Sequence, residues 1–160
     1  MIRNLFFLSL VFFLFSSCSK SVDGSCTYTT SNVVAPSSEV ATLQAYITAN
    51  HPAAVQHSSG LFYEIVAPGT GTVTPNVCST VTVKYSGYLT NGYKFDENLS
   101  GAIYTLGQFI LGWQYGVPLI KKGGSINLYL PPTLGYGSAG TTNIPGNSIL
   151  IFYIQLLDVK

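Results

Sequence analysis

The sequence predicts an α+β fold, in which a curved antiparallel β-sheet of about five strands packs against one short α-helix, with a small helical extension at the N-terminus. Three observations support this class. Several segments alternate apolar and polar residues with a period of two, which is the pattern of half-buried strands. Asn91-Gly92 is a typical two-residue turn of a β-hairpin. One central segment instead places its apolar residues at helical spacing.

The short helix is predicted for residues 106–117, LGQFILGWQYGV, which hold the only tryptophan of the chain. Phe109 and Trp113 are four residues apart and therefore share one face of a helix. Gly112 costs about 1 kcal/mol of helix propensity relative to alanine, so we interpret it as a position of close packing. Pro118 disfavours helical geometry in the residue before it and is expected to end the helix. A helix of this length is not stable alone, so we expect it to lie against the sheet.

The predicted strands follow one another along the chain and are separated by turn signals. The last of them is apolar on both faces for most of its length, so we expect a central strand that is covered on both sides. A glycine-rich loop precedes it, over residues 135–147. In chain order, the strand candidates are residues 61–66, 81–89, 93–95, 126–130 and 148–159.

The composition argues against several functions. Charged residues make up 8% of the chain and the formal net charge is +1, so we expect no nucleic-acid partner. His51 and His57 have no cysteine or acidic partners at the spacing of metal ligands, so we expect neither a metal nor another cofactor. No motif typical of a nucleophilic or zinc-dependent hydrolase is present in the sequence.

Residues 1–17 are predicted to be a signal peptide. Arg3 precedes an apolar run over residues 5–15, which is shorter than the roughly twenty residues of a membrane span. The small residues before Cys18 make this site similar to a bacterial lipobox, which implies cleavage before Cys18 and acylation of that cysteine. The alternative is an ordinary signal peptide with an incidental cysteine. Several acyl chains would anchor the protein stably, and the outer membrane is favoured because no aspartate follows Cys18.

The mature chain is predicted to have three parts. Residues 18–37 are rich in serine and threonine and form a tether behind the lipidated cysteine. Residues 38–59 form a helical extension, in which Leu43 and Ile47 lie on an apolar stripe. This extension either docks on the main domain or stays mobile in a linker. Residues 60–160 form the main domain.

Two further cysteines, Cys26 and Cys78, belong to the mature chain. In an oxidising compartment they are a candidate disulfide, which would tie the tether to the strand region. The alternative is a pair of buried free thiols that pack as small apolar groups.

Residues 60–160 resemble an FKBP-type peptidyl-prolyl cis-trans isomerase in four motifs that follow one another in the family's order. The resemblance implies a strongly curved sheet that closes over the short helix, with an apolar pocket between them. It also implies an enzyme that acts on the X-Pro bonds of exported polypeptides in the cell envelope; we expect a monomer held at the membrane by its lipid. The motifs are VTVKYSGYLTNGYKFD (81–96), LGQFILGWQYGV (106–117), LYLPPTLGYG (128–137) and IPGNSILIFYIQLLDV (144–159).

The resemblance assigns roles to nine side chains of the pocket. Trp113 is expected to form its floor, under the proline ring of the substrate. Tyr136 is expected to donate a hydrogen bond to a substrate carbonyl, and Asp96 to hydrogen-bond at the rim. The aromatic walls are assigned to Tyr85, Phe95 and Phe152, and the apolar substrate contacts to Phe109, Ile110 and Ile144.

Two departures from the family pattern affect this pocket. The aromatic residue expected a few positions before Leu106 is absent, with Ala102 or Ile103 in its place. The loop residues 138–142, SAGTT, are small. One wall is therefore expected to be thinner, which would affect affinity and turnover more than the fold.

A prolyl isomerase makes and breaks no covalent bond. It lowers a rotation barrier of about 18–20 kcal/mol, and a dry aromatic pocket favours the twisted amide because that state has less charge separation than the planar one. The sequence leaves simpler roles open: Trp113, Tyr85 and Phe152 as core residues, and Asp96 as the cap of a turn. The alternative functions are a non-catalytic module that binds proline-containing or unfolded segments, and a purely structural envelope lipoprotein.

Overall fold

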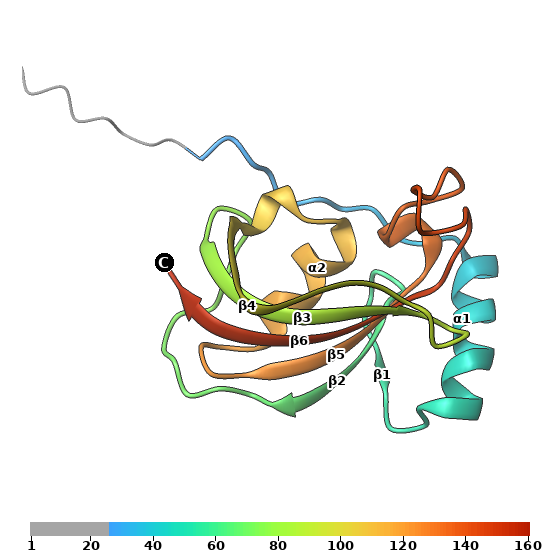
Figure 1. The fold of residues 1–160 in the computed structure, drawn as a ribbon, viewed down its shortest axis with the longest axis horizontal. Helices are drawn as coiled ribbons and strands as arrows, with labels where there is room; N and C mark the ends of the chain where they lie inside the picture. Colours follow the sequence, from blue (N-terminus) through green and yellow to red (C-terminus); the bar gives the residue numbers. More distant parts are fainter. Residues whose placement is uncertain (1–25) are drawn as a thin grey trace, which may run out of the picture.

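The computed structural model describes residues 26–160, so the predicted signal peptide and lipidated Cys18 lie outside the described residues. The described chain forms one antiparallel sheet, with α2 on its concave face and α1 against one end of its outer face (Figure 1). No helix in this part of the chain is long and apolar enough to cross a membrane. The elements are α1 (Ser37–Asn50), β1 (Val55–Gln56), β2 (Phe62–Ala67), β3 (Thr80–Leu89), β4 (Lys94–Thr105), α2 (Leu111–Gly116), β5 (Ser125–Leu130) and β6 (Leu150–Val159), with 3-10 helices η1 (Leu106–Gln108), η2 (Val117–Leu119) and η3 (Pro132–Leu134).

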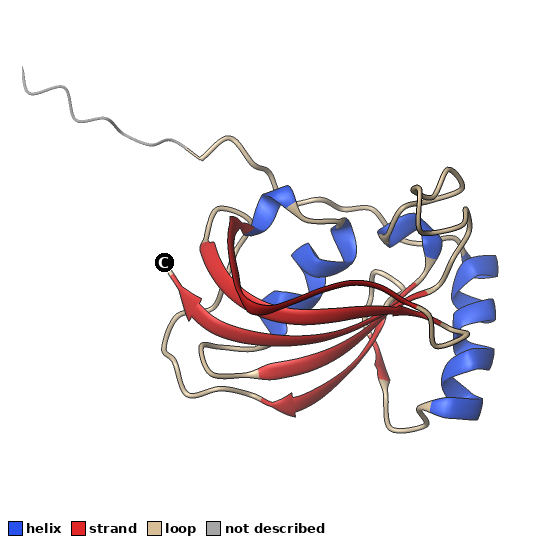
Figure 2. Cartoon of the chain, viewed as in Figure 1, coloured by secondary structure: helices blue, strands red, loops and turns tan. Residues whose placement is uncertain are grey.

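The sheet has six strands in the order β1-β2-β5-β6-β3-β4 (Figure 2). The sixth strand is β1, a two-residue edge strand too short to give a periodic signal. β6 is central, as predicted, and pairs with β5 and β3. It is not covered on both faces throughout, however: Ile151 is buried under α1, whereas Tyr153 on the same outer face is 44% exposed. The helix therefore covers only the start of this strand.

β4 is much longer than the predicted strand at residues 93–95, because a bulge hides its pattern. The pairing register with β3 shifts between Val83 and Tyr85. At this irregularity Asn98 Oδ1 accepts the backbone N–H groups of Ser100 and Gly101, at 3.1 and 2.9 Å. Such a bulge inserts extra residues and breaks the strict alternation by which a strand is recognised.

The concave face packs on α2 through two glycines. A Cβ atom at Gly112 would overlap the side chain of Leu130, and one at Gly116 would overlap Leu128. The close packing predicted at Gly112 is thus confirmed. The helix itself is shorter than predicted, because the two residues before Leu111 have extended backbone. The prediction that Pro118 ends the helix was wrong. Pro118 lies near the start of η2, where a backbone N–H has no partner within the helix and its absence costs no hydrogen bond.

α1 docks on the domain through an apolar and a polar contact. Leu43 and Ile47 are buried against the outer face of the sheet. Nearer its start, the carboxylate of Glu39 accepts hydrogen bonds from the backbone N–H and the hydroxyl of Thr133, both at 2.8 Å. The structure therefore favours the docked extension over a mobile linker. The sheet side chains under α1 are Phe62, Tyr129 and Ile151.

Before α1, residues 26–36 cross the domain on the side of η1 and α2 (Figure 1). We call this segment the N-terminal strap. At its start Cys26 forms a disulfide with Cys78, with 5.6 Å between the two Cα atoms.

Candidate active site

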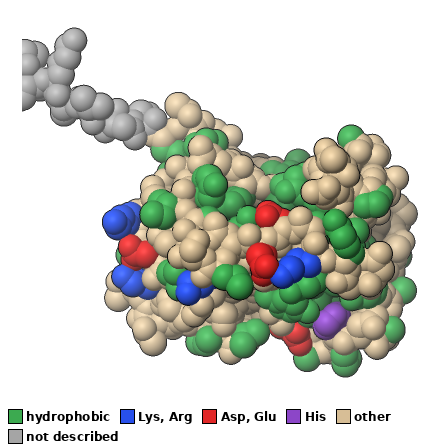
Figure 3. Space-filling model, in the orientation of Figure 1, with side chains coloured by type: hydrophobic (Ala, Val, Ile, Leu, Met, Phe, Trp, Pro, Cys, Tyr) green, Lys and Arg blue, Asp and Glu red, His purple; other side chains and the backbone are tan. Residues whose placement is uncertain are grey.

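A cavity of about 270 Å³ lies between α2 and the concave face of the sheet. Its lining comes from β3, β4 and β6 on one side, from η1 and α2 on the other, and from the loop after η3. Seven of the nine side chains predicted from the sequence are part of it. Figure 3 shows charged side chains of both signs gathered at the left edge of this view and near its middle. The lining residues are Tyr85, Asp96, Tyr104, Gln108, Phe109, Ile110, Trp113, Tyr136 and Phe152.

Trp113 forms the floor of this cavity. Its side chain is 2% exposed, yet it contributes to the lining, so a ligand that fills the cavity meets the indole. Phe109 stacks on it with 4.5 Å between ring centroids, and Tyr85 and Phe152 meet it edge-on at 5.1 and 5.3 Å. The indole Nε1–H has no hydrogen-bond partner among the described residues. The immediate neighbours of the ring are therefore aromatic.

Tyr85 and Asp96 come from paired strands and form the main polar contact of the site. The Tyr85 hydroxyl donates to Asp96 Oδ2 at 2.8 Å. Burial raises the pKa of Tyr85 far above its ordinary value, and the hydrogen bond to Asp96 raises it further. The phenol, which is protonated at neutral pH in any case, therefore keeps donating into the alkaline range. This bond holds the carboxylate in place and the Tyr85 ring against the indole.

Tyr136 stands in the glycine-rich loop after η3 and is 39% exposed. Its neighbour Gly137 has φ +62°, a conformation that favours glycine. The Gly137 N–H donates to the carbonyl of Pro132, and its own carbonyl accepts from the N–H of Asn147, both at 2.9 Å. Burial and the charge of Asp96 raise the pKa of Tyr136. The loop thus presents a neutral hydroxyl that can donate to a carbonyl oxygen.

Two lining residues, Tyr104 and Gln108, were missed by the sequence prediction. Tyr104 meets Phe109 edge-on, with 5.4 Å between ring centroids. It lies just after Ala102 and Ile103, one of which stands where an aromatic residue was expected, so the wall is filled from a neighbouring position. A search for an aromatic residue at either position would have found it. The side chain of Gln108 accepts the backbone N–H of Thr105 at 3.1 Å and fixes the entry to η1.

Phe95 and Ile144 do not line the cavity. Phe95 packs edge-on behind Phe152, with 5.5 Å between ring centroids, so it supports a wall without forming it. Gly87 makes this contact possible, because a Cβ there would lie 2.6 Å from Phe95 and 2.9 Å from Phe152. Ile144 is 4% exposed and belongs to the main apolar core. Its backbone forms an isolated antiparallel bridge with Thr141, so the chain reverses direction within the loop at this point.

Comparison with known families agrees with this geometry. The profile of the FKBP-type peptidyl-prolyl cis-trans isomerase family matches residues 71–157. The chain therefore belongs to this family, and its antiparallel sheet with one short helix is an FKBP-like fold.

The relatives that match are bacterial proteins of the same family. The chain is 50% identical over 106 residues to the FKBP-type peptidyl-prolyl cis-trans isomerase FkpA of Buchnera aphidicola (subsp. Schizaphis graminum), covering 64% of this chain and 42% of the relative. It is 44% identical over 106 residues to FkpA of Escherichia coli K12, covering 64% of this chain and 39% of the relative. The chain thus spans about two fifths of the length of these curated relatives.

Two solved structures share the architecture. A crystal structure of FkpA from Escherichia coli superposes with a TM-score of 0.70 at 39% identity, covering 78% of this chain and 60% of that one. A peptidyl-prolyl cis-trans isomerase from Pseudomonas syringae gives a TM-score of 0.68 at 25% identity, covering 79% of this chain and 97% of that one.

Proposed function

We propose that this protein catalyses the cis–trans isomerisation of X-Pro peptide bonds. The observation that carries the proposal is the cavity over the buried Trp113 indole, whose ring is surrounded by aromatic side chains while hydroxyl and carboxylate groups lie among the lining residues. Membership of the isomerase family supports the same activity. The substrates are proline-containing polypeptides, whose proline ring fills the space above the indole.

The proposed mechanism is desolvation with fixed orientation. The planar amide has a larger dipole than the twisted one, so moving it from water into the aromatic cavity penalises the planar state more. Tyr136 donates to a substrate carbonyl and fixes the chain direction. Asp96, held by Tyr85, limits the movement of the rim. No group in this scheme needs to exchange a proton with the substrate.

A proline tetrapeptide assay tests the activity directly. A soluble fragment of residues 19–160 is expected to accelerate cis–trans exchange of the peptide. Tyr136→Phe removes one hydrogen bond to the substrate and is expected to lower kcat/KM about fivefold, since such a bond contributes on the order of 1 kcal/mol. Tyr93→Phe is the matched control, because Tyr93 is exposed and absent from the cavity lining. A wild-type fragment that leaves the exchange rate unchanged would overturn the proposal.

The second candidate function is a module that binds proline-containing or unfolded segments without useful turnover. Stacking of Phe109 on the indole favours it, because that ring takes up space above the floor of a small cavity. The small loop residues 138–142 point the same way. Suppression of aggregation that persists after Phe152→Ala, together with no isomerase activity in the wild type, would select this function.

We further propose that the protein works in the cell envelope on exported proteins, as a monomer anchored by an acylated Cys18. The Cys26–Cys78 disulfide supports an oxidising compartment. Labelled palmitate is expected to appear in the full-length protein expressed in a bacterium and to be absent from Cys18→Ser. Unlabelled wild-type protein would contradict the anchor, and light scattering of the soluble fragment tests the monomer.

A further inference from the structure

The N-terminal strap (residues 26–36) touches the outer side of the cavity wall that contains Phe109. Tyr28 places its ring directly on the backbone of Gly107, where an added Cβ would lie 2.8 Å from the Tyr28 Cβ and closer still to its ring. Gly107 belongs to η1 and is followed by the two lining residues Gln108 and Phe109. The strap is therefore packed against the segment that leads into the site.

The disulfide fixes the strap beside this same segment. The residues on both sides of Cys78 bind η1 through their carbonyls: Val77 accepts the N–H of Gly107 at 2.8 Å, and Ser79 accepts that of Leu106 at 2.9 Å. The bond from Cys78 to Cys26 then places Tyr28 two residues away on the strap. Wall, disulfide and strap are thus linked over a few residues.

From the cavity side, the wall is held by α2. The Gln114 side chain donates to the carbonyl of Phe109 at 2.8 Å and to that of Gly107 at 3.3 Å. Phe109 itself stacks on Trp113. The segment between Leu106 and Phe109 therefore contacts α2 and Tyr28 as well as residues 77–79, and losing Tyr28 removes the one side chain of the strap that packs on Gly107.

The strap also binds α2 farther along. The Tyr115 hydroxyl donates to the carbonyl of Val33 at 3.0 Å. The N–H of Ala35 donates to the carbonyl of Ser59 at 2.9 Å, and Ala35 is buried in the main core. The end of the strap near α1 thus stays attached when the disulfide is absent. Loss of the disulfide would release chiefly the portion that contains Tyr28.

We propose that Tyr28, held by the Cys26–Cys78 disulfide, is a positioning residue for the substrate-binding wall formed by Gln108 and Phe109. It touches no substrate and acts through the backbone of Gly107. This inference rests on the proposed isomerase function, but its structural half, the ordering of residues 106–109, can be measured without turnover. The disulfide then sets substrate affinity as well as stability.

The first experiment replaces Tyr28 in the soluble protein of residues 19–160. Tyr28→Ala is expected to raise KM for a proline tetrapeptide about fivefold with little change in kcat, because a loosened wall weakens binding of the ground state and the transition state alike. Tyr28→Phe keeps the ring and is expected to restore the wild-type KM. Val34→Ala is the matched control, because Val34 is on the strap but 62% exposed. An unchanged KM in Tyr28→Ala would overturn the proposal.

The second experiment measures amide hydrogen exchange in the same variants. Tyr28→Ala is expected to speed exchange at residues 106–109 while β6 keeps its protection. Faster exchange in β6 by the same factor would mean a general loss of stability and would contradict a positioning role. If the wild type has no isomerase activity, the proposed function fails, and the exchange pattern still decides whether Tyr28 orders the wall.

The third experiment removes the disulfide through Cys26→Ser with Cys78→Ser. The double variant is expected to raise KM as Tyr28→Ala does, and adding Tyr28→Ala to it is expected to change KM little further. Reduction of the wild type by a dithiol is expected to raise KM by the same factor, because it also breaks the bond between Cys26 and Cys78. In this step two electrons and two protons convert the protein disulfide to two thiols, while the dithiol is oxidised to its own disulfide. If the increase in KM of the triple variant equalled the product of the increases caused by the cysteine replacements and by Tyr28→Ala, the disulfide and Tyr28 would act independently. That result would overturn the proposal that the disulfide acts through Tyr28.

Discussion

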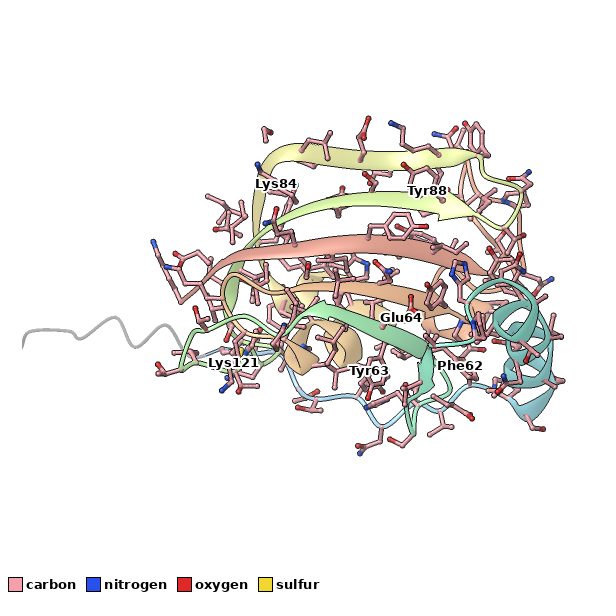
Figure 4. All side chains as sticks on the ribbon, turned by 90° about the horizontal axis from the view of Figure 1, so that it is seen from below. Phe62, Tyr63, Glu64, Lys84, Tyr88 and Lys121 are labelled. Carbon is pink, nitrogen blue, oxygen red and sulfur yellow. A yellow bond between two sulfur atoms is a disulfide. The ribbon has the colours of Figure 1, made fainter. Side chains whose placement is uncertain are left out.

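The two faces of the sheet each contain a tyrosine hydrogen-bonded to a carboxylate, and only one pair lies at the candidate active site. On the concave face Tyr85 donates to Asp96 at 2.8 Å. On the outer face Tyr129 donates to Glu64 Oε2 at 3.0 Å; Figure 4 shows Glu64 on this face, near α1. The pKa of each tyrosine is raised, first by burial and then by its hydrogen bond.

The difference between the pairs is what surrounds them. Tyr129 is fully buried, and the His51 ring lies against it at a tilt of 36°, with 4.5 Å between ring centroids. Tyr85 and Asp96 instead line the cavity above the indole. A buried tyrosine with a raised pKa is therefore no sign of a functional site by itself. An adjoining cavity with an aromatic floor is the feature that separates the two faces.

The largest expected effect is on the outer face. Tyr129→Ala should destabilise the protein by about 3–5 kcal/mol, because it removes a large buried ring and leaves Glu64 without its hydroxyl donor. The kcat/KM per folded molecule should not change at temperatures where the variant is folded. Urea denaturation and the tetrapeptide assay measure the two effects. Tyr153→Ala, on the same face but 44% exposed, serves as the control and should cost little; a loss of specific activity in Tyr129→Ala would contradict the comparison.

A smaller change separates the two faces more sharply. Tyr85→Phe and Tyr129→Phe each remove one hydroxyl and keep the ring, and each should cost about 1 kcal/mol of stability. Only Tyr85→Phe should lower kcat/KM, by several-fold, because it releases Asp96 at the cavity. The assay is run on both variants side by side. Equal activities would mean that the Tyr85–Asp96 bond has no part in catalysis.

The raised pKa values of Tyr85 and Tyr129 should both contribute to the pH dependence of the free energy of unfolding. A tyrosine with a raised pKa in the folded state stabilises the protein fully below its unfolded value of 10.0. That stability is lost as the pH rises above it, because the unfolded state then releases protons that the folded state retains. The free energy of unfolding should thus stay level from about pH 7 to 9 and fall above about pH 10. The Tyr85→Phe/Tyr129→Phe double variant should show a shallower fall, and an identical curve would refute the assignment.

The smallest effect is expected at the carboxylates. Glu64→Gln keeps an acceptor for Tyr129 and should cost less than about 1 kcal/mol, with no change in activity. Asp96→Asn likewise keeps an acceptor for Tyr85, but it removes the charge beside Tyr136 and should alter KM modestly. Denaturant midpoints and kinetic constants of the two variants make the comparison. A change in KM for Glu64→Gln would contradict it.

Regular elements with clean periodicity could be predicted from the sequence. The central position of β6 and the close packing at Gly112 both followed from local patterns. A continuous apolar run indicates a central strand, and a glycine within a helical pattern indicates close packing. β4 could not be bounded, since the bulge at Asn98 interrupts the alternation that identifies a strand. The exposure of Tyr153 depends on how far α1 extends over the sheet. The periodicity of neighbouring residues does not predict that distance.

The site was predicted where one residue type is required and was missed where neighbouring positions can substitute. A single indole and a tyrosine between two glycines leave little choice of position. An aromatic wall, in contrast, can be supplied from any nearby position of a strand, so the wall was predicted to lack an aromatic residue at Ala102 or Ile103 and Tyr104 was overlooked. Whether Phe95 forms the wall or supports it depends on side-chain packing across three strands, which sequence spacing does not encode.

Trp113 has one more consequence, which follows from its being the sole tryptophan of the chain. Its emission reports on the cavity floor alone, without interference from other indoles and without an attached dye. Titration of an unlabelled proline peptide, followed by the colour and intensity of that emission, therefore yields occupancy in solution. The same fluorescence titration measures peptide binding in variants that have lost turnover.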